Sequence, residues 1–233
     1  MEERIDILLL QMQFQIIYSL LIMNNSAKFD IVNEISNVYK KEQLTMMKTY
    51  SRITDTLVSS KFLEKYFRSD CIELAVLNSY LDMNLPYDLF KKYNTAIILG
   101  TRNGNINAKS QFALSIKNGA SPILFRMTTS NLLSSLLSIF LDTNGYSTTI
   151  FCEVDEMDLL INLALIYLQY NNNDIVITGH FSHVEIDDTI NCYLFILSKA
   201  KIFADAKICD LTAKKVKLHI ENKMHFYEKE NNQ

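Results

Sequence analysis

The sequence predicts an α/β fold built on a mixed sheet of mainly buried strands covered by helices. A β-branched segment at 146–154, a strongly apolar helical segment at 157–170 and an apolar strand run at 174–178 follow one another, an order typical of parallel sheets. Two further strand runs lie at 95–99 and 191–197. The 233 residues, 48% of them hydrophobic and 21% charged, are enough to bury the core of one domain.

The amino-terminal segment 5–23 is the most apolar stretch of the chain. Asp6 and the glutamines at 11, 13 and 15 interrupt it, and two acidic residues precede it. A signal peptide has a basic start, and a membrane-spanning helix needs about 20 nearly uninterrupted apolar residues. We therefore expect a core strand or helix here, and no membrane association.

Helical spacing dominates the segment between residues 30 and 81, where apolar residues recur at steps of three and four without any Gly or Pro. This predicts several amphipathic helices, and we interpret residues 30–90 as a helix-rich insertion. A core at 95–200 and a polar carboxy-terminal tail at 212–233 complete one domain that covers residues 1–233.

Shorter helices are predicted between the first two core strands. The pattern at 108–117 is helical, and Gly119 is suited to end it. Ser121 and Pro122 begin the next element. The segment 131–141 has serines among leucines, which indicates a helix that packs closely against another backbone.

The charge and the cysteines exclude several classes of function. A net charge of −3, with 23 basic and 26 acidic residues, gives no cationic surface for nucleic acid. The cysteines at 71, 152, 192 and 209 lack CxxC spacing, so we expect reduced thiols in a cytoplasmic protein. No motif indicates a cofactor, and we expect no bound metal.

From Ala96 to Thr178 the sequence resembles the amino-terminal half of β-ketoacyl synthases, which have a thiolase-like fold. In that family a strand ends in Gly, a Ser-Pro segment with a Phe follows, an Asn opens a small-residue helix, and a Gly begins the nucleophile strand. The matching residues here, at the family's spacing, are Gly100, Ser121, Pro122, Phe125, Asn131 and Gly145.

The same spacing puts Val154 at the position of the family's catalytic cysteine, nine residues after Gly145. Counting back from the following strand gives the same answer, since Asp174 stands twenty residues after Val154, as the family pattern requires. Valine has no nucleophile, and Asp155 and Glu156 would repel an anionic thiolate or oxyanion. The family's two later histidine motifs are also missing. The resemblance therefore implies a chain without catalytic activity of its own.

A narrower group, the short chain-length factors of type II polyketide and aryl-polyene synthases, carries S-R-x-G-E and S-P-x-x-F-S-x-S-V-H-N patterns. Residues 101–105 and 121–131 resemble them, with Arg126 and Ser130 as departures. This implies a subunit that forms a heterodimer with an active ketosynthase, contacts acyl carrier protein through that complex, and limits the length of the acyl tunnel.

The resemblance also implies roles for individual residues. The candidates that close the tunnel are Phe112, Ile116, Phe125 and Met127. The candidates for the partner interface are Asn131, Ser134, Ser135, Ser138, Phe151 and Cys152.

Other functions stay open from the residues themselves. Cys152 with His180 or His183 could form a stand-alone acyl-binding or acyltransferase site, although a packed thiol and ordinary loop histidines after a strand are the simpler interpretation. The HxxH spacing of the two histidines is compatible with a metal, but no second ligand cluster accompanies it. The polar stretch 101–105 lacks the Gly-Lys-Ser/Thr of a phosphate loop, so we interpret it as a turn that begins a helix. A homodimeric scaffold is a third possibility.

Overall fold

A six-stranded mixed sheet forms the centre of the molecule, in the strand order β3-β2-β4-β5-β1-β6. Strands β3 and β4 both pair with β2 in parallel, whereas β5, β1 and β6 continue the sheet in antiparallel pairs. The computed structural model describes residues 27–40, 71–83, 85, 89–129, 131–184, 189–199, 207–212, 214–220 and 222. The strands are β1 (Phe29–Lys40), β2 (Thr95–Thr101), β3 (Ser147–Phe151), β4 (Ile175–Val184), β5 (Thr189–Lys199) and β6 (Ile208–Leu211).

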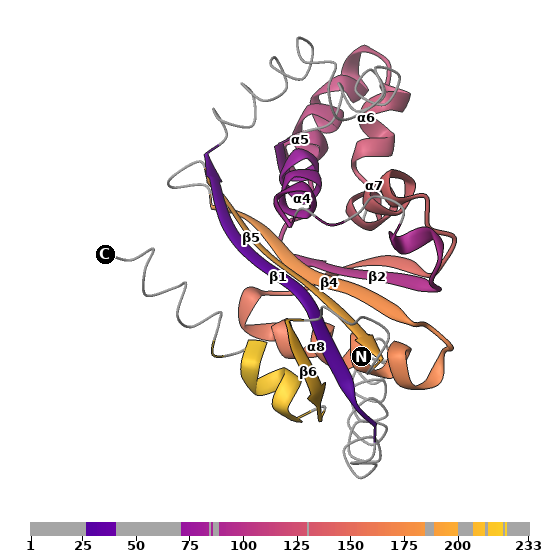
Figure 1. Cartoon of the computed structure of the whole chain (residues 1–233). Coiled ribbons are helices and arrows are strands. Elements are labelled where there is room, and N and C mark those ends of the chain that lie inside the picture. Colours follow the sequence, from indigo (N-terminus) through magenta and orange to yellow (C-terminus); the bar gives the residue numbers. More distant parts are fainter. Residues whose placement is uncertain are drawn as a thin grey trace, which may run out of the picture.

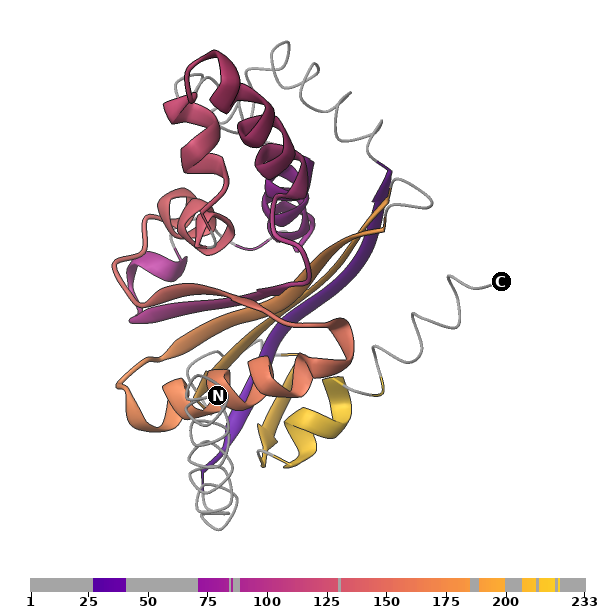
Figure 2. The same cartoon turned by 180° about the vertical axis from the view of Figure 1, so that it is seen from behind.

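Helices cover both faces of this sheet (Figure 1). One face carries α4 and α7, with α5 and α6 stacked beyond them, and the other carries α8 together with the helical residues 214–220, as the reverse view also shows (Figure 2). The helices are α4 (Cys71–Asp82), α5 (Ile106–Ser115), α6 (Pro122–Met127), α7 (Leu132–Leu141) and α8 (Met157–Tyr170), and the short 3-10 turns are η1 (Leu89–Lys91), η2 (Ile116–Asn118) and η3 (Val154–Glu156).

Alternation along the central strands divides the core into two layers. In β2, Ile97 and Leu99 pack toward α4 and α7, whereas Ala96 and Ile98 pack toward α8. All four side chains are fully buried. Continuous burial of β2 follows from its place between two parallel neighbours, with helices on both faces. The predicted α/β fold with mainly buried strands is therefore confirmed.

Residues 29–40 are a correction to the predicted helices of 30–81. They form β1, which pairs with β5 over its whole length. A bulge between Ile31 and Asn33 reverses which face the odd-numbered residues meet, so that Ile31 packs toward α8, whereas Val32 and Ile35, three residues apart, both lie in the α4 layer. The bulge therefore gives a strand the three- and four-residue apolar spacing of a helix. Helix α4 confirms the last part of that prediction, and residues 41–70 lie outside the described part.

The histidines after the strand at 174–178 are a second correction, because they lie inside β4 and not in a loop. Strand β4 continues to Val184 and forms an antiparallel pair with β5. Within the polar tail, residues 214–220 are helical, and Val216 and Ile220 are buried against the α8 layer. The rest of the tail from 223 and the apolar segment 5–23 lie outside the described residues.

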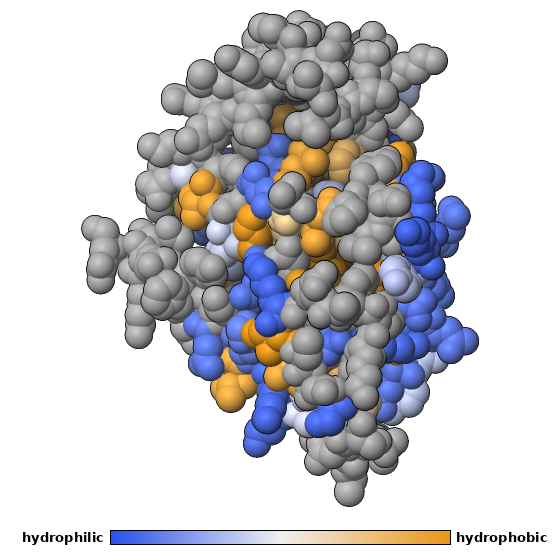
Figure 3. Space-filling model, viewed as in Figure 1, coloured by the Kyte–Doolittle hydropathy of each residue, from blue (hydrophilic) through white to orange (hydrophobic). Residues whose placement is uncertain are grey.

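The described part of the surface shows no single large hydrophobic or hydrophilic area on the face seen in Figure 3. On the face shown in Figure 3, hydrophobic and hydrophilic residues of the described segments lie interspersed. Among the described residues, no helix is both long and apolar enough to cross a membrane.

Candidate functional site

The candidate site lies where the parallel strands β2 and β3 end. After β2 the chain passes to the face of α5 and α7, and after β3 it passes to the opposite face, where α8 lies (Figure 1). Where two adjacent strands of an α/β sheet are followed by connections on opposite faces, their loops separate at the carboxyl ends of the strands and leave a crevice in which ligands commonly bind. The two loops that meet here are residues 101–105 and 152–156.

The first loop is a turn that begins α5, as predicted. Thr101 Oγ1 accepts a hydrogen bond from the Gly104 amide at 3.1 Å, and Gly104 takes a positive φ of 57°. Asn105 Oδ1 caps α5 by accepting from the Ala108 amide at 3.0 Å. Its Nδ2 donates to Oε1 of the buried Glu73 of α4 at 3.1 Å. The loop is thereby fixed between two helices.

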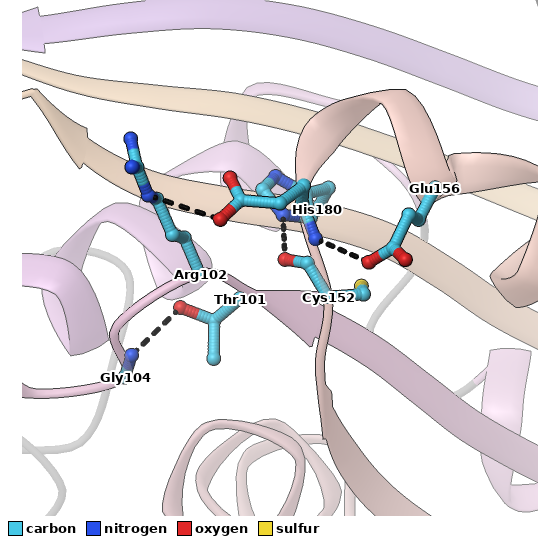
Figure 4. A network of polar contacts seen from close by, with 7 residues as sticks. Thr101, Arg102, Gly104, Cys152, Glu156 and His180 are labelled. Atoms are coloured by element: carbon cyan, nitrogen blue, oxygen red, sulfur yellow. Dashed lines mark hydrogen bonds and ion pairs between the residues drawn. The ribbon is translucent and has the colours of Figure 1, made fainter.

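The second loop turns the chain from β3 into α8 and is held by its own carboxylates (Figure 4). The Cys152 amide donates to the Thr101 carbonyl at 3.1 Å, which continues the β2–β3 ladder by one residue. The Glu153 amide donates to Glu156 Oε2 at 2.8 Å, as in a capping box. Arg102 Nε lies 3.2 Å from Glu153 Oε1, so an exposed ion pair joins the two loops.

Val154, for which the sequence resemblance predicts the nucleophile position, is the first residue of η3 and is half-buried. Asp155 and Glu156 follow it and are exposed at the start of the helical region. Carboxylates at this end stabilise a helix, but they disfavour any second negative charge nearby. The turn therefore favours structure over an anionic intermediate.

Cys152, His180 and Gly100 form a tightly packed group beneath this turn. His180 Nε2 donates to the Cys152 carbonyl oxygen at 3.0 Å (Figure 4), which fixes the tautomer with the proton on Nε2. A Cβ on Gly100 would lie 2.7 Å from Cys152 Sγ and 3.1 Å from His180 Cδ2. Glycine is therefore required at position 100 for these two side chains to meet over β2.

Burial sets the protonation of both side chains. It is the main reason that the pKa of Cys152 rises from 9.0 to about 11, and nearby Glu156 raises it further. Burial also lowers the pKa of His180, against the opposing effects of its hydrogen bond and the nearby acids. Both groups are neutral at physiological pH. This is the packed thiol that the simpler interpretation predicted, and Cys152 is only 5% exposed.

His183 does not join this group. Alternate residues of a strand share one face of the sheet. His183 is therefore on the same face of β4 as Ile177 and Phe181, which belong to the α4 layer, whereas His180 is on the same face as Val176, which belongs to the α8 layer. The two histidines thus point to opposite faces of the sheet. Among the described residues there is no group of three or more His, Cys, Asp and Glu residues that could hold a metal.

The amino-terminal end of α7 is attached to β3, which is the edge strand of the sheet. Asn131 does not cap α7, since its Oδ1 accepts instead from the Thr149 amide at 3.3 Å. The Ser134 amide donates to Thr149 Oγ1 at 3.2 Å, and this hydroxyl lies 3.1 Å from Ser134 Oγ. Close approach of α7 to another backbone, predicted from its serines, is therefore observed.

The other two serines of α7 take different roles. Ser135 donates through its amide to the Asn131 carbonyl at 3.0 Å, within the first helical turn. Ser138 bonds Thr143 beyond the other end of the helix, with its Oγ 3.1 Å from the Thr143 carbonyl oxygen. Of the four polar α7 candidates, it is therefore Asn131 and Ser134 that hold the edge strand.

Phe151 is the half-exposed last residue of β3, and it is held firmly for a surface aromatic. The ammonium of Lys109 lies 4.7 Å from its ring centroid, and this same Nζ donates to the Asn103 carbonyl at 3.1 Å. The ring also packs on Gly104, where a Cβ would come within 3.2 Å of Cε1.

The four tunnel candidates lie together on a lobe formed by α5, η2 and α6 (residues 106–127). The rings of Phe112 and Phe125 contact each other, with centroids 5.5 Å apart. Ile116 and Phe125 are 57% and 58% exposed, whereas Phe112 and Met127 are half-buried. The two helices are thus joined by an aromatic contact that remains partly open to solvent.

The sequence names His180 as a candidate beside Cys152 but assigns it to a loop, although the even spacing of this residue from Val176 and Thr178 could have placed it in the strand and on the α8 face. One member of the site is missed altogether. Lys109 gives no signal, because its role depends on the distant Phe151.

Solved structures show what this arrangement resembles. A ketosynthase (ApeO) in complex with its chain length factor (ApeC) from Xenorhabdus doucetiae matches with a TM-score of 0.50 and 15% identity, over 75% of this chain and 80% of that one. The ishigamide ketosynthase/chain length factor matches with a TM-score of 0.54 and 12% identity, over 76% and 63%. A β-ketoacyl synthase from Burkholderia phymatum STM815 gives 0.55 and 8%, over 75% and 60%.

The chain has a ketosynthase-like, thiolase-like fold. At these identities the likeness establishes the fold alone, and the chain spans less than two thirds of the ishigamide and Burkholderia proteins it matches. No protein-family profile matches the sequence, and no curated protein matches it either.

Proposed function

We propose that this chain is a chain-length factor, a non-catalytic subunit that forms a heterodimer with an active ketosynthase and sets the length of a polyketide or polyene chain. The turn between β3 and α8 carries this proposal. It has Val154 where the resemblance puts the nucleophile, a neutral buried thiol at Cys152, and two exposed acids, Asp155 and Glu156. Two of the similar structures contain a ketosynthase and a chain length factor, which supports such a partner.

The lobe of α5, η2 and α6 is the part that would close the partner's tunnel. Phe112 and Phe125 present one aromatic pair from two helices, so the wall is stiffer than a single ring. Fitting another two-carbon unit against such a wall costs about 1–3 kcal/mol of overpacking. By the relation between free energy and equilibrium constant, this would bias where elongation stops by roughly five- to 150-fold.

The edge strand β3 and the adjacent end of α7 would form the interface. Phe151 supplies a pre-positioned aromatic anchor there, beside Asn131 and Ser134. We further propose that the heterodimer works in the cytoplasm with an acyl carrier protein, which reaches this chain through the complex.

Co-expression with a complete ketosynthase as candidate partner and with an acyl carrier protein tests this proposal. We expect a 1:1 complex by size-exclusion mass analysis, and a longer product when Phe112→Ala opens the aromatic pair. Gln111→Ala is the matched control, since it removes an exposed polar side chain from the same helix outside the ring contact. Failure to form a complex, or an unchanged product with Phe112→Ala, would refute the tunnel role.

An acyltransferase that uses Cys152 is the alternative, and the proximity of His180 is the observation in its favour. Against it, the Nε2 proton of His180 is already donated to the Cys152 carbonyl, and the pKa of the thiol is raised. Product formation by the complex should therefore survive Cys152→Ala, whereas the alternative requires its complete loss.

A further inference from the structure

The lobe of residues 106–127 differs in charge from the rest of the molecule. The whole chain has more acidic than basic residues, yet no Asp or Glu occurs between Asp88 and Asp142. The lobe itself carries three cations and no anion, and these cations are Lys109, Lys117 and Arg126. An acidic protein thus presents one surface element that is only basic.

Two of the three cations are available for a partner. Lys109 is engaged with Phe151 and the Asn103 carbonyl. Lys117 and Arg126 are exposed, and in the described part of the chain neither has a carboxylate partner. Their charges would therefore be left unpaired if another protein covered the lobe without offering an anion.

Each free cation stands next to an exposed apolar side chain. Lys117 follows Ile116, and Arg126 follows Phe125, while Leu114 on the same lobe is 72% exposed. An apolar centre with a charged border is the usual composition of a protein interface. Burying the apolar residues brings the cations to the border, where they need opposite charges to offset the loss of water.

We infer that the ketosynthase surface that receives this lobe has an apolar centre bordered by carboxylates, which pair with Lys117 and Arg126. The inference rests on the proposed function, because that function supplies the partner. The apolar residues hold the lobe in place, and the cations steer its approach, since complementary charge mainly increases association rates and fixes orientation. The complex therefore forms fastest at low salt.

Association kinetics between the two purified subunits test this division of roles. We expect the double variant Lys117→Glu, Arg126→Glu to lower the association rate constant by about tenfold or more at low ionic strength, near about 50 mM salt, where charges are weakly screened. The difference should shrink to about twofold near about 0.5 M salt. Phe125→Ala should instead raise the dissociation rate constant at both salt concentrations.

The matched control is Lys214→Glu, Lys215→Glu, which changes the charge equally on exposed residues of the helix at 214–220. We expect the association rate constant of this control to lie within about twofold of wild type, because its charges lie outside the interface.

Equal slowing of association by both double variants, or slowing that salt does not reduce, would overturn the inference while the wild-type complex still supports the proposed function. Absence of any wild-type complex would refute the proposed function itself. Binding of wild type, but not of the lobe variant, to vesicles of anionic lipid would overturn the inference in favour of a membrane surface.

Discussion

The protonation of Cys152 distinguishes a packed thiol from a nucleophile, and it can be measured directly. Its pKa of about 11, against 9.0 for an ordinary thiol, leaves about one hundredth of the usual thiolate at neutral pH. Since only the thiolate reacts, alkylation by iodoacetamide should be at least about 100-fold slower in the folded protein than at the same residue in denaturant. The rate should rise with pH until about pH 11.

The variant Glu156→Gln tests the stated cause of this shift. Burial is the largest cause and Glu156 the second, so neutralising the acid should accelerate alkylation by less than about tenfold. The glutamine side chain can still accept the bond from the Glu153 amide through its carbonyl oxygen, which preserves the turn. Quantitative mass spectrometry of the Cys152 peptide separates this thiol from the other cysteines.

Two results would refute the reasoning. One is alkylation of folded Cys152 at neutral pH as fast as in denaturant, which would show that the thiolate is available. The other is acyl transfer from a thioester probe to Cys152, which would support the acyltransferase alternative.

Three further predictions concern stability and assembly. Gly145→Ala should lower the free energy of unfolding by about 3 kcal/mol, because a Cβ there would overlap the Thr95 carbonyl. Gly119→Ala should lower it by only about 1 kcal/mol, through the positive φ of 95°, since no atom lies within 4 Å of the added Cβ. Equal losses for the two variants in chemical denaturation would contradict this. The pKa of His180 is lowered in the fold, so protonation of this residue favours the unfolded chain. Wild type should therefore lose stability relative to His180→Gln as the pH falls through about 6.5. Unfolding free energies of the two proteins that change in parallel with pH would argue against this. Asn131→Ala should lower the free energy of unfolding by about 1 kcal/mol and promote self-association, since it leaves the Thr149 amide of the edge strand without its acceptor. If the variant remains as monodisperse as wild type in sedimentation velocity, this amide does not limit pairing between edge strands.

Local rules could predict most of the central fold. Strands β2 to β5 and helix α8 are each marked by a run of apolar or β-branched residues with a clear boundary. The caps are equally readable, since Ser121 accepts from the Leu124 amide and Gly119 ends η2 with a positive φ. These features depend on neighbours within a few residues, which a sequence displays directly.

Strand β1 could not be predicted, because its bulge imitates a helical spacing and its partner β5 lies far along the chain. Long-range contacts set the site in the same way. His180 meets Cys152 across 28 positions, and Lys109 finds Phe151 across the loop after β2. No local pattern encodes such pairs, so the sequence could suggest the position of the turn but not its contacts.

The turn after β3 is held in shape by hydrogen bonds and one ion pair of its own residues and their neighbours. Its shape depends on the Glu153–Glu156 bond, the Arg102 ion pair and the donation from His180 to the Cys152 carbonyl, none of which needs a nucleophile. The same acids that stabilise the start of the helical region would oppose an anionic thiolate there. In this turn, stability of the helix start and reactivity of a thiolate are therefore opposed, whereas active sites usually give up stability for reactivity. If the chain works as proposed, its contribution to elongation must then come from the shape and charge of the α5–α6 lobe and not from this turn.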